Sequence, residues 1–408
     1  MATFRYRGRS SRGELILGEL DADTADVVAT QLFNSGITPI DIGLKPPERQ
    51  TLGSLWRHLT GNKPRLDDLI LFARQMYALV KAGVPLVRGL TSLEQSSHNE
   101  TLRTALRDIV GNLESGRDLA GSLARHPNVF SPLFVSVVRV GENSGNLEEA
   151  FLRIFNYLSL EKDIRTRIKT AFRYPIFVVT AIVVAITIIT LFVVPRFVAF
   201  FKSVRMRLPW PTRLIMGVSD FAQHYWWLVL LVSVVSLFFL RRYIRTERGR
   251  YRWDGFKLRV PVVGSIIMQA TLARFARAFA LCYRSGVPLV QALTLVARAV
   301  GNEYVAERVL QMRTGVERGE SLTRTSRAVG VFTPLVIQMI SVGEETGNVA
   351  EMLDETGGFY EREVDYELQT LSTNIEPVLL VIMGAMVLIL ALGVFLPMWN
   401  LAANASHL

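Results

Sequence analysis

Two closely matching phrases decide the fold of this chain: VGENSGNLEEA, residues Val140–Ala150, and VGEETGNVAEM, residues Val342–Met352. The second phrase lies 202 positions after the first. A longer pair keeps nearly the same offset, since FARQMYALVKAGVPLVRGL from Phe72 aligns with FARAFALCYRSGVPLVQAL from Phe275. Recurrence of this kind is typical of a duplicated structural unit. The chain of 408 residues is therefore predicted to hold two copies of one domain.

The repeated phrase has the composition of a tight corner between two helices. Gly145 can adopt the left-handed backbone conformation that commonly ends a helix. Asn146 is expected to cap the next helix, with Glu149 as its capping-box partner three residues later. The matching residues of the second repeat are Gly347, Asn348 and Glu351. The phrase therefore predicts a helical hairpin in each copy.

The segments AGVPLV and SGVPLV predict a second kind of corner, where a glycine ends one helix and a proline begins the next. The residues at these corners are Gly83, Pro85, Gly286 and Pro288. Gly116 and Gly319 form a further matching pair. Apolar residues recur at three-four spacing ahead of the first corner, as on one face of a helix. Helices joined by such corners predict an antiparallel bundle of about six helices in each repeat.

Each phrase also carries a glycine followed by a glutamate, Gly141–Glu142 in the first copy and Gly343–Glu344 in the second. Two interpretations of the carboxylates stay open. They are either charges that a partner protein recognises or helix-end residues that hydrogen-bond their own corner. The surrounding capping residues favour the structural role.

Three apolar runs predict transmembrane helices at residues 175–195, 225–240 and 377–397. The first and third contain no charged residue over 21 positions. A helix of that length reaches about 31 Å, which matches the ~30 Å hydrocarbon core of a bilayer. A buried core helix is the alternative, but such helices seldom stay apolar on every side for so long.

Basic residues set the expected orientation. Five precede the first span (Lys162, Arg165, Arg167, Lys169 and Arg173), and a second basic cluster follows the second span from Arg241 to Arg259. Because positive charge stays on the cytoplasmic side, residues 1–174 and 241–376 are expected to be cytoplasmic. The loop 196–224 and the tail 398–408 are then expected on the opposite side. Five basic residues within that loop argue against this placement: Arg196, Lys202, Arg205, Arg207 and Arg213.

The remaining segments complete the expected order of domains. Residues 1–42 read as a small ββαβ module, with strands in TFRYRG, ELILGEL and ITPIDI, and residues 43–66 read as a linker. The repeats occupy 67–174 and 270–376, joined by a basic connector at 241–269. The predicted fold class is an all-α integral membrane protein with two tandem helical bundles, three transmembrane helices and the N-terminal module.

No catalytic, cofactor-binding or metal-binding motif is found in the sequence. A phosphate-binding loop is missing, and the five histidines are scattered. The spans carry no ionisable residue, which disfavours transport and intramembrane catalysis. The net charge of +10 is expected to attract anionic membrane lipids rather than nucleic acid, because arginines gather beside the spans. The single Cys282 reads as a small core residue.

The two-copy motif, GVPL followed by VGE-x-[ST]-G-x-[LV] ahead of a span, resembles the inner-membrane platform proteins of type II secretion systems and type IV pili (the GspF/PilC family). The opening segment resembles the mannose-sensitive haemagglutinin (MSHA) pilus branch. The resemblance implies a non-enzymatic, multi-pass protein of the bacterial inner membrane, with a cytoplasmic N-terminus and a periplasmic C-terminus.

The implied partners are a cytoplasmic hexameric assembly ATPase, the transmembrane helices of pilins or pseudopilins, other inner-membrane assembly proteins, membrane lipids and further copies of the chain. Such a platform would couple the ATPase to the insertion of pilins into a filament. Two alternatives from other classes stay open: a component that transports a small solute, and a membrane-anchored signalling adaptor.

Overall fold

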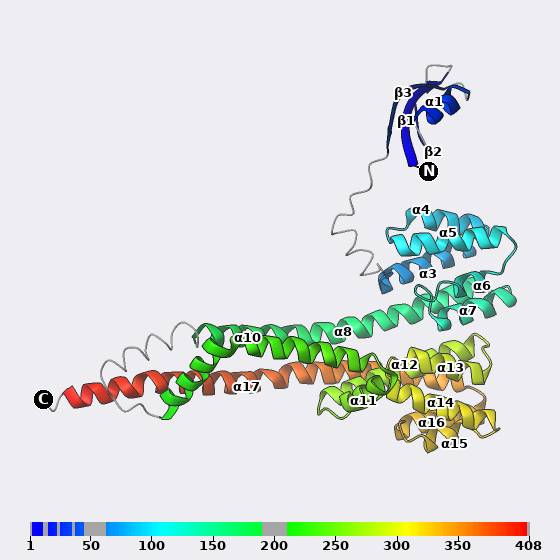
Figure 1. The fold of residues 1–408 in the computed structure, drawn as a ribbon. Helices are drawn as coiled ribbons and strands as arrows, with labels where there is room; N and C mark the ends of the chain where they lie inside the picture. The colour runs from blue at the N-terminus through cyan, green and yellow to red at the C-terminus, as the bar shows by residue number, and fades with distance from the viewer. Residues whose placement is uncertain are drawn as a thin grey trace. The chain divides into compact units, whose positions relative to one another are not determined.

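The computed structural model describes residues 2–10, 15–22, 25–34, 37–44, 63–189 and 210–405. The chain divides into two compact units, Met1–Asn62 and Lys63–Leu408. Each unit is a separate body with its own contacts, and the larger one carries both repeats (Figure 1).

The smaller unit is a three-stranded antiparallel sheet with one helix. Its elements are β1 (Ala2–Ser10), β2 (Leu15–Ala22), α1 (Ala25–Asn34) and β3 (Ile37–Leu44). Strand β1 lies between the other two, so that Phe4 pairs with Leu20 on one side and with Leu44 on the other. Val28 and Leu32 of α1 are buried, which places the apolar face of this helix in the core. The turn expected at SSRG and most of the linker lie outside the described residues.

Residues 63–189 fold into the helices of the first repeat: α3 (Leu66–Lys81), α4 (Leu86–Ser96), α5 (Glu100–Glu114), α6 (Leu119–Ala124), α7 (Pro132–Asn143) and α8 (Leu147–Ile188). The second repeat has the same order: α12 (Val263–Arg284), α13 (Leu289–Ala299), α14 (Glu303–Glu317), α15 (Leu322–Ala328), α16 (Pro334–Thr346) and α17 (Val349–Ala405). Between them lie α10 (Trp210–Ile244) and α11 (Glu247–Lys257). The duplication read from the sequence is therefore a duplication of six-helix bundles.

Helix starts follow the local chemistry of the sequence. The Ser131 hydroxyl accepts the backbone N–H of Phe134 ahead of Pro132, and Thr333 does the same for Val336 ahead of Pro334. Side-chain caps of this type each contribute about 1 kcal/mol. Both pairs begin the helix that leads into the repeated phrase.

Phenylalanine side chains fill the centre of each bundle. In the first repeat the rings of Phe72, Phe130, Phe134 and Phe151 lie 5.2 to 6.5 Å apart between centroids. In the second repeat Phe275 lies 4.7 Å from Phe332 and 5.9 Å from Phe279. These tilted and edge-on arrangements are those that aromatic rings favour in protein cores. Cys282 is fully buried nearby in the sequence, as expected for a small core residue.

The membrane-directed helices are longer than the apolar runs suggest. Helix α8 passes through Pro175 without a break, so the last bundle helix and the expected span are one helix rather than two segments. Helix α17 likewise runs for 57 residues. Proline blocks a helical hydrogen bond, but it does not end α8. The domain boundary expected at Pro175 therefore does not coincide with a break in the helix.

Three further segments differ from the sequence expectation. Residues 210–224, expected within a loop, belong to α10, and the basic connector contains α11 and the start of α12. Residues 398–405, expected as a tail, continue α17. In the first and third segments the helix extends the neighbouring apolar run, because once a helix has started each further residue adds a hydrogen bond at little extra cost. Helix α11 is instead a separate polar helix that begins at its own N-cap, Thr246.

Three described helices are long and apolar enough to cross a membrane: Leu147–Ile188, Val263–Arg284 and Val349–Leu388. Only 6% of the apolar window of the first and third is buried within the protein, against 67% for the second. Helix α12 is therefore the core helix of the second bundle, which explains its apolar composition. By contrast, the apolar side chains of α10 from Val232 to Leu240 are exposed, as expected for a helix that faces lipid.

Candidate functional site

The glycine corners adopt the conformations that their sequence predicts. The φ angles of the corner glycines are all positive, at Gly83, Gly116, Gly145, Gly286, Gly319 and Gly347. At Gly145 the amide of Asn146 donates to Gly141 O at 2.7 Å, and the amide of Gly145 donates to Glu142 O at 3.2 Å. This pair of bonds is the Schellman motif that closes a helix C-terminus. Pro85 and Pro288 occupy the N-cap positions of α4 and α13.

Glu142 links two distant helices. Its carboxylate accepts the backbone N–H groups of Leu119 at 2.6 Å and Ala120 at 2.9 Å, at the start of α6. The first N–H groups of a helix have no partner within the helix, and a carboxylate there is also favoured by the helix dipole. These contacts support the structural role that the sequence favoured for Glu142, but its partners lie more than twenty residues earlier in the chain and not in its own corner.

Glu344 makes the same contact in the second repeat. Its carboxylate accepts the N–H groups of Leu322 at 2.9 Å and Thr323 at 3.1 Å, and the Thr323 hydroxyl at 2.7 Å. Burial opposes ionisation of Glu344, but the hydrogen bonds from Thr323 and Leu322 outweigh it and hold the pKa of this carboxyl below its usual value. Each glutamate thus links the corner of its repeat to the start of a short helix, α6 or α15. We call this contact a glutamate staple.

Gly141 and Gly343 let two helices approach closely at each corner. A Cβ atom added to Gly141 would lie 2.5 Å from the Cβ of Ala150, and one added to Gly343 would lie 2.7 Å from the Cα of Val349. Neither distance is compatible with a side chain. The glycine of the repeated phrase is therefore required by packing between α7 and α8 and between α16 and α17.

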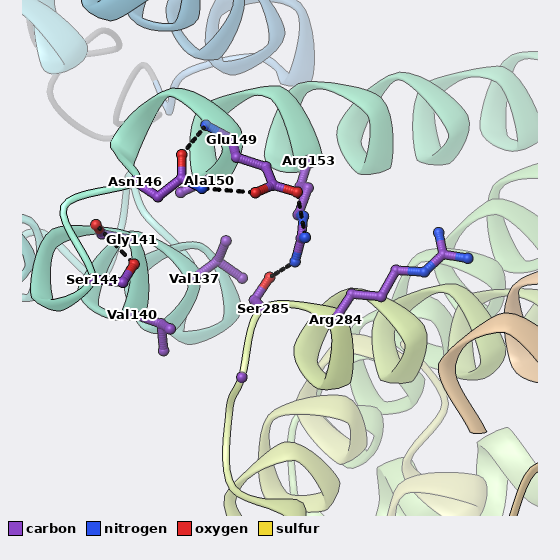
Figure 2. A pocket seen from close by; sticks show the side chains of 11 residues that line it. Val137, Val140, Gly141, Ser144, Asn146, Glu149, Ala150, Arg153, Arg284 and Ser285 are labelled. Carbon is purple, nitrogen blue, oxygen red and sulfur yellow. Dashed lines mark hydrogen bonds and ion pairs between the residues drawn. The ribbon is translucent and has the colours of Figure 1, made fainter. Parts of the chain in front are cut away.

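The corner of the first repeat faces the second repeat across a cavity of about 320 Å³ (Figure 2). Asn146 caps α8 by accepting the N–H of Glu149 at 3.3 Å, as predicted. The Glu149 carboxylate, however, accepts the side-chain amide of Asn146 at 2.8 Å, because the backbone N–H of Asn146 is already used by the Schellman motif. The capping box expected from the sequence is therefore replaced by a side-chain bond. Arg153 connects this group to the second repeat through Ser285 Oγ at 3.4 Å.

In the second repeat, Asn348 and Glu351 occupy the matching positions around the start of α17, directly after the left-handed Gly347. Gly347 itself is the C-cap of α16. The two corners thus share the left-handed glycine and the helix start that follows it. A contact from the corner to the other repeat is described for the first corner.

A cluster of buried charges joins the repeats. The Glu161 carboxylate of α8 accepts Arg165 Nε at 2.6 Å and Arg274 Nε of α12 at 3.0 Å. The side chain of Glu161 is only 9% exposed and that of Arg274 19% exposed. Further along α8, Arg167 pairs with Asp365 of α17. In the sequence, Arg165 and Arg167 were recognised only as basic residues beside a span, and Glu161, Arg274 and Asp365 were missed. The one available signal was that Arg274 replaces the Leu71 of the first copy.

A second ionic cluster holds α12 against α17 within the second repeat. Arg277 donates through Nε and one terminal nitrogen to the two oxygens of Glu361, at 2.8 and 2.9 Å, and also pairs with Asp354. These bonds, above all those with Glu361, raise the pKa of Arg277 despite its burial. Two-pronged pairs of this kind fix geometry as well as charge.

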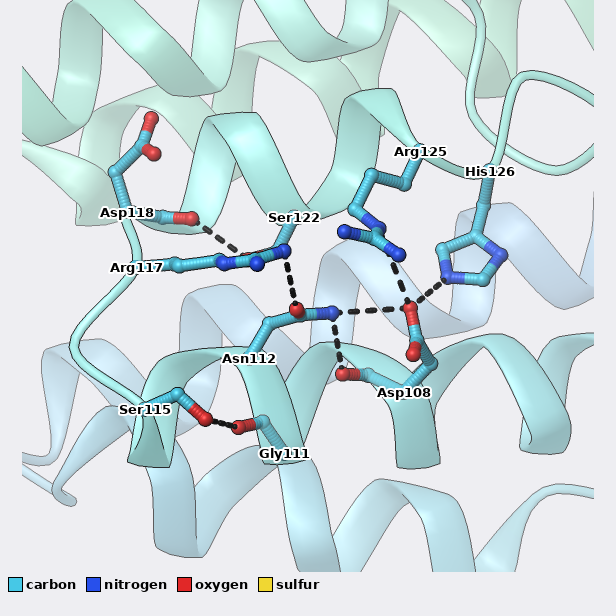
Figure 3. Close-up of polar contacts among 9 residues, drawn as sticks. All are labelled: Asp108, Gly111, Asn112, Ser115, Arg117, Asp118, Ser122, Arg125 and His126. Carbon is cyan, nitrogen blue, oxygen red and sulfur yellow. Dashed lines mark hydrogen bonds and ion pairs between the residues drawn. The ribbon is translucent and has the colours of Figure 1, made fainter.

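The first repeat carries a polar face on α5 and α6 (Figure 3). Asp108 accepts His126 Nε2 at 2.8 Å and Asn112 Nδ2 at 3.0 Å, and Arg117 donates to Asn112 Oδ1 at 3.0 Å. Arg125 lies 3.9 Å from the same carboxylate. The hydrogen bond from His126 is the main reason that the pKa of Asp108 is lowered. These contacts hold the side chains of Arg117 and Arg125 in place on an exposed surface.

Among the residues that the structure describes, no group of three or more histidine, cysteine, aspartate or glutamate side chains is placed to hold a metal ion. The clusters above consist of ion pairs and helix caps whose acceptors are already filled. Their chemistry is that of rigid contacts between helices.

Comparison with known proteins explains the duplication. Residues 72–195 and 275–397 each match the family described as type II secretion system (T2SS), protein F. The chain belongs to the type II secretion system protein F family. Residues 1–43 match the N-terminal domain described for protein F.

Relatives of this protein F family member occur in pilus and secretion machines alike. The chain is 33% identical to the type IV pilus assembly protein PilC of Thermus thermophilus over 408 residues, all of both chains. It is 32% identical to the type IV pilus assembly protein TapC of Aeromonas hydrophila, covering 98% of this chain and 95% of that one. It is also 32% identical to the type II secretion system protein F of Pseudomonas aeruginosa, covering 98% and 99%.

Proposed function

We propose that this protein is the inner-membrane platform of a type IV pilus or type II secretion machine and couples a cytoplasmic assembly ATPase to the insertion of pilins or pseudopilins. The observation that carries the proposal is the continuity of α8 and α17. Each helix begins in the core of a bundle, where Phe151 and Leu353 are buried, and continues into a segment with exposed apolar side chains. A displacement of either bundle would therefore move a membrane helix directly.

Rigid coupling between the bundles supports the same role. Helix α17 contacts both α8 and α10 (Figure 1). The ion pairs Glu161–Arg274 and Arg167–Asp365 join α8 to the second repeat near the point where the bundle helices leave the core. Force applied to one bundle would pass to the other instead of being absorbed by a hinge.

The polar face of α5 and α6 is the surface best suited to the ATPase. Its arginines, Arg117 and Arg125, are exposed and held in place by Asn112 and Asp108. The second repeat lacks this network, since Gln311 and Gly315 stand where the first has Asp108 and Asn112. Ordered cations on an exposed surface favour acidic groups of a partner.

The exposed apolar faces of α8 and α17 would contact pilin transmembrane helices and lipid. We place the bundles in the cytoplasm, because basic residues from Arg241 to Arg259 lie at the bundle end of α10. The C-terminus would then be periplasmic. Assignment to the mannose-sensitive haemagglutinin branch stays a prediction.

Co-purification tests the proposal. The full-length chain in native membranes is expected to retain the assembly ATPase encoded by the same genome. The double variant Arg117→Glu, Arg125→Glu should lose at least tenfold of the bound ATPase. Arg324→Glu is the matched control, because this arginine of α15 is also exposed but lies in the second repeat. Absence of ATPase from wild-type membranes would contradict the proposal, and equal loss with the control variant would exclude this face.

A further inference from the structure

The two repeats contact each other through the equivalent helices α8 and α17 and, beside them, through non-equivalent faces. In the non-equivalent contacts, α7 and α8 of the first repeat meet α12 and α13 of the second. Within this contact, a Cβ atom added to Gly286 would lie 3.6 Å from Val140 Cγ1. The reciprocal contact, of α3 or α4 with α16, is not among the substantial helix contacts of residues 63–189 and 210–405. The repeats are therefore related head to tail and not by a two-fold axis.

In a head-to-tail contact the two repeats use different faces. The face that the first repeat uses therefore stays free on the second repeat, and the face that the second repeat uses stays free on the first. On α7, the side chain of Val137 is fully buried and Val140 half-buried against the second repeat. Their counterparts on α16 remain apolar but are each less buried: Met339 is half-buried and Val342 is 38% exposed. Helix α16 thus keeps the composition of an interface that residues 63–189 and 210–405 of this chain do not fill.

The complementary face is uncovered on the first repeat. In the second repeat, Leu281 and Val287 of the corner between α12 and α13 are buried. The matching positions between α3 and α4 are Ala78, which is exposed, and Val84, which is half-buried. Leu71 on the same helix is 55% exposed. The chain therefore carries both halves of a second interface at its two ends.

We propose that the α16 face of one chain binds the α3–α4 corner of a second copy, in the geometry that joins the two repeats within one chain. The membrane permits this repetition. Helices α8 and α17 run side by side in the same sense, so the operation that relates the repeats keeps the membrane helices parallel (Figure 1). A second chain added by the same operation would have its helices in the same bilayer.

Charge at the rim of the proposed contact is complementary. Exposed Glu355 of α17 stands at the position that Arg153 has in the first repeat. Opposite it, the α3 end of the first repeat carries exposed Lys81 and Ala82, where the second has Arg284 and Ser285. At the proposed contact Glu355 would face Lys81, whereas between the two repeats of one chain Arg153 faces Ser285. Opposite charges at a rim guide orientation more than they add affinity.

Crosslinking between two differently tagged full-length chains tests this surface. Both chains carry Cys282→Ala, one also carries Ala82→Cys and the other Val342→Cys. They are co-expressed without any assembly ATPase, and isolated membranes are treated with a short bismaleimide. We expect a crosslinked species containing both tags, at least fivefold above the control pair of Ala82→Cys with Leu310→Cys, because Leu310 is similarly exposed on another helix.

Three results would overturn the proposal. The first is crosslinking no stronger than in the control pair. The second is stronger crosslinking of Val342→Cys with itself, which would indicate a two-fold contact. The third is protection of Val342→Cys from maleimide only when the ATPase is added, which would assign the face to the motor. Because the main assay contains no ATPase, its failure is distinct from failure of motor binding.

A charge introduced into the apolar face of α16 tests the proposed contact independently. Val342→Glu should reduce the crosslink between Ala82→Cys and Glu355→Cys at least fivefold, whereas the isosteric Val342→Thr should reduce it less. Val342 is a surface residue within this chain, so the fold should tolerate both changes, and equal thermal melting of the variants checks this. Unchanged crosslinking in the Val342→Glu variant would refute the proposed face.

Discussion

Glu161 of the first repeat accepts a hydrogen bond from Arg274 of the second at 3.0 Å, with both side chains largely removed from water. The two residues lie 113 positions apart in the chain. Arg274 replaces Leu71 of the first copy, so only the second repeat carries the arginine that this ion pair between the repeats requires. It is a contact that joins the repeats into one body while leaving each bundle's own core apolar.

Breaking this pair should destabilise the protein in an unequal manner. Glu161→Ala leaves Arg274 without its buried partner and should cost about 3–5 kcal/mol. Arg274→Ala should cost about 1–3 kcal/mol, because Arg165 still compensates the carboxylate. Arg165→Ala is the control, since its side chain is 63% exposed and should cost less than about 1 kcal/mol. Urea unfolding of the full chain in detergent measures these differences, and equal losses for all three variants would contradict the buried-pair interpretation.

The glutamate staples predict a second series. Glu142→Ala removes the only side-chain acceptor that the structure describes for the N–H groups of Leu119 and Ala120, and should lower the free energy of unfolding by about 1–3 kcal/mol. Glu142→Gln should lose less, because its amide oxygen still accepts one bond. The matched control is Glu345→Ala, whose exposed carboxylate accepts a hydrogen bond from the Ser341 hydroxyl at 3.1 Å. If Glu142→Ala behaved like this control, the staple would have no energetic role.

Glu344 should make stability depend on acid pH. Its pKa is lower in the folded protein than the ordinary value of 4.5, because the hydrogen bonds favour the ionised form. The unfolded state then binds more protons near that pH, so stability is present above the unfolded pKa and is lost as pH falls through the folded pKa. Glu344→Gln should flatten the decline in melting temperature below about pH 4.5. An unchanged decline in this variant, with Glu345→Gln as reference, would exclude the contribution.

Two glycine substitutions should have opposite signs. Gly141→Ala places a Cβ atom 2.5 Å from Ala150 Cβ and 3.1 Å from a backbone oxygen, so overpacking should cost about 1–3 kcal/mol. Gly111→Ala lies in the exposed last turn of α5 with no atom within 4 Å of the new Cβ. It should stabilise the protein by about 0.5–1 kcal/mol through helix propensity. Thermal melting of the two variants compares them, and a neutral Gly141→Ala would show that α7 and α8 can separate at little cost.

Local signals in the sequence were sufficient for the helices and their corners. A left-handed glycine, a hydroxyl before proline and an apolar run each act within a few residues of themselves, so Gly145, Ser131 and the segment after Pro175 could be interpreted without a structure. The boundary between a bundle helix and its membrane span was harder to predict, because Pro175 has the same local signal whether the bundle helix continues through it or stops there.

The sequence by itself determined that one six-helix unit occurs twice, each time leading into an apolar helix. Only the tertiary structure decided that Glu142 reaches Leu119, that Glu161 meets Arg274, and that the repeats join head to tail. The physical reason is that both copies carry nearly the same local signals, so nothing in them specifies which face of one copy meets the other. That choice depends on side chains more than a hundred positions apart, whose contact is created by folding.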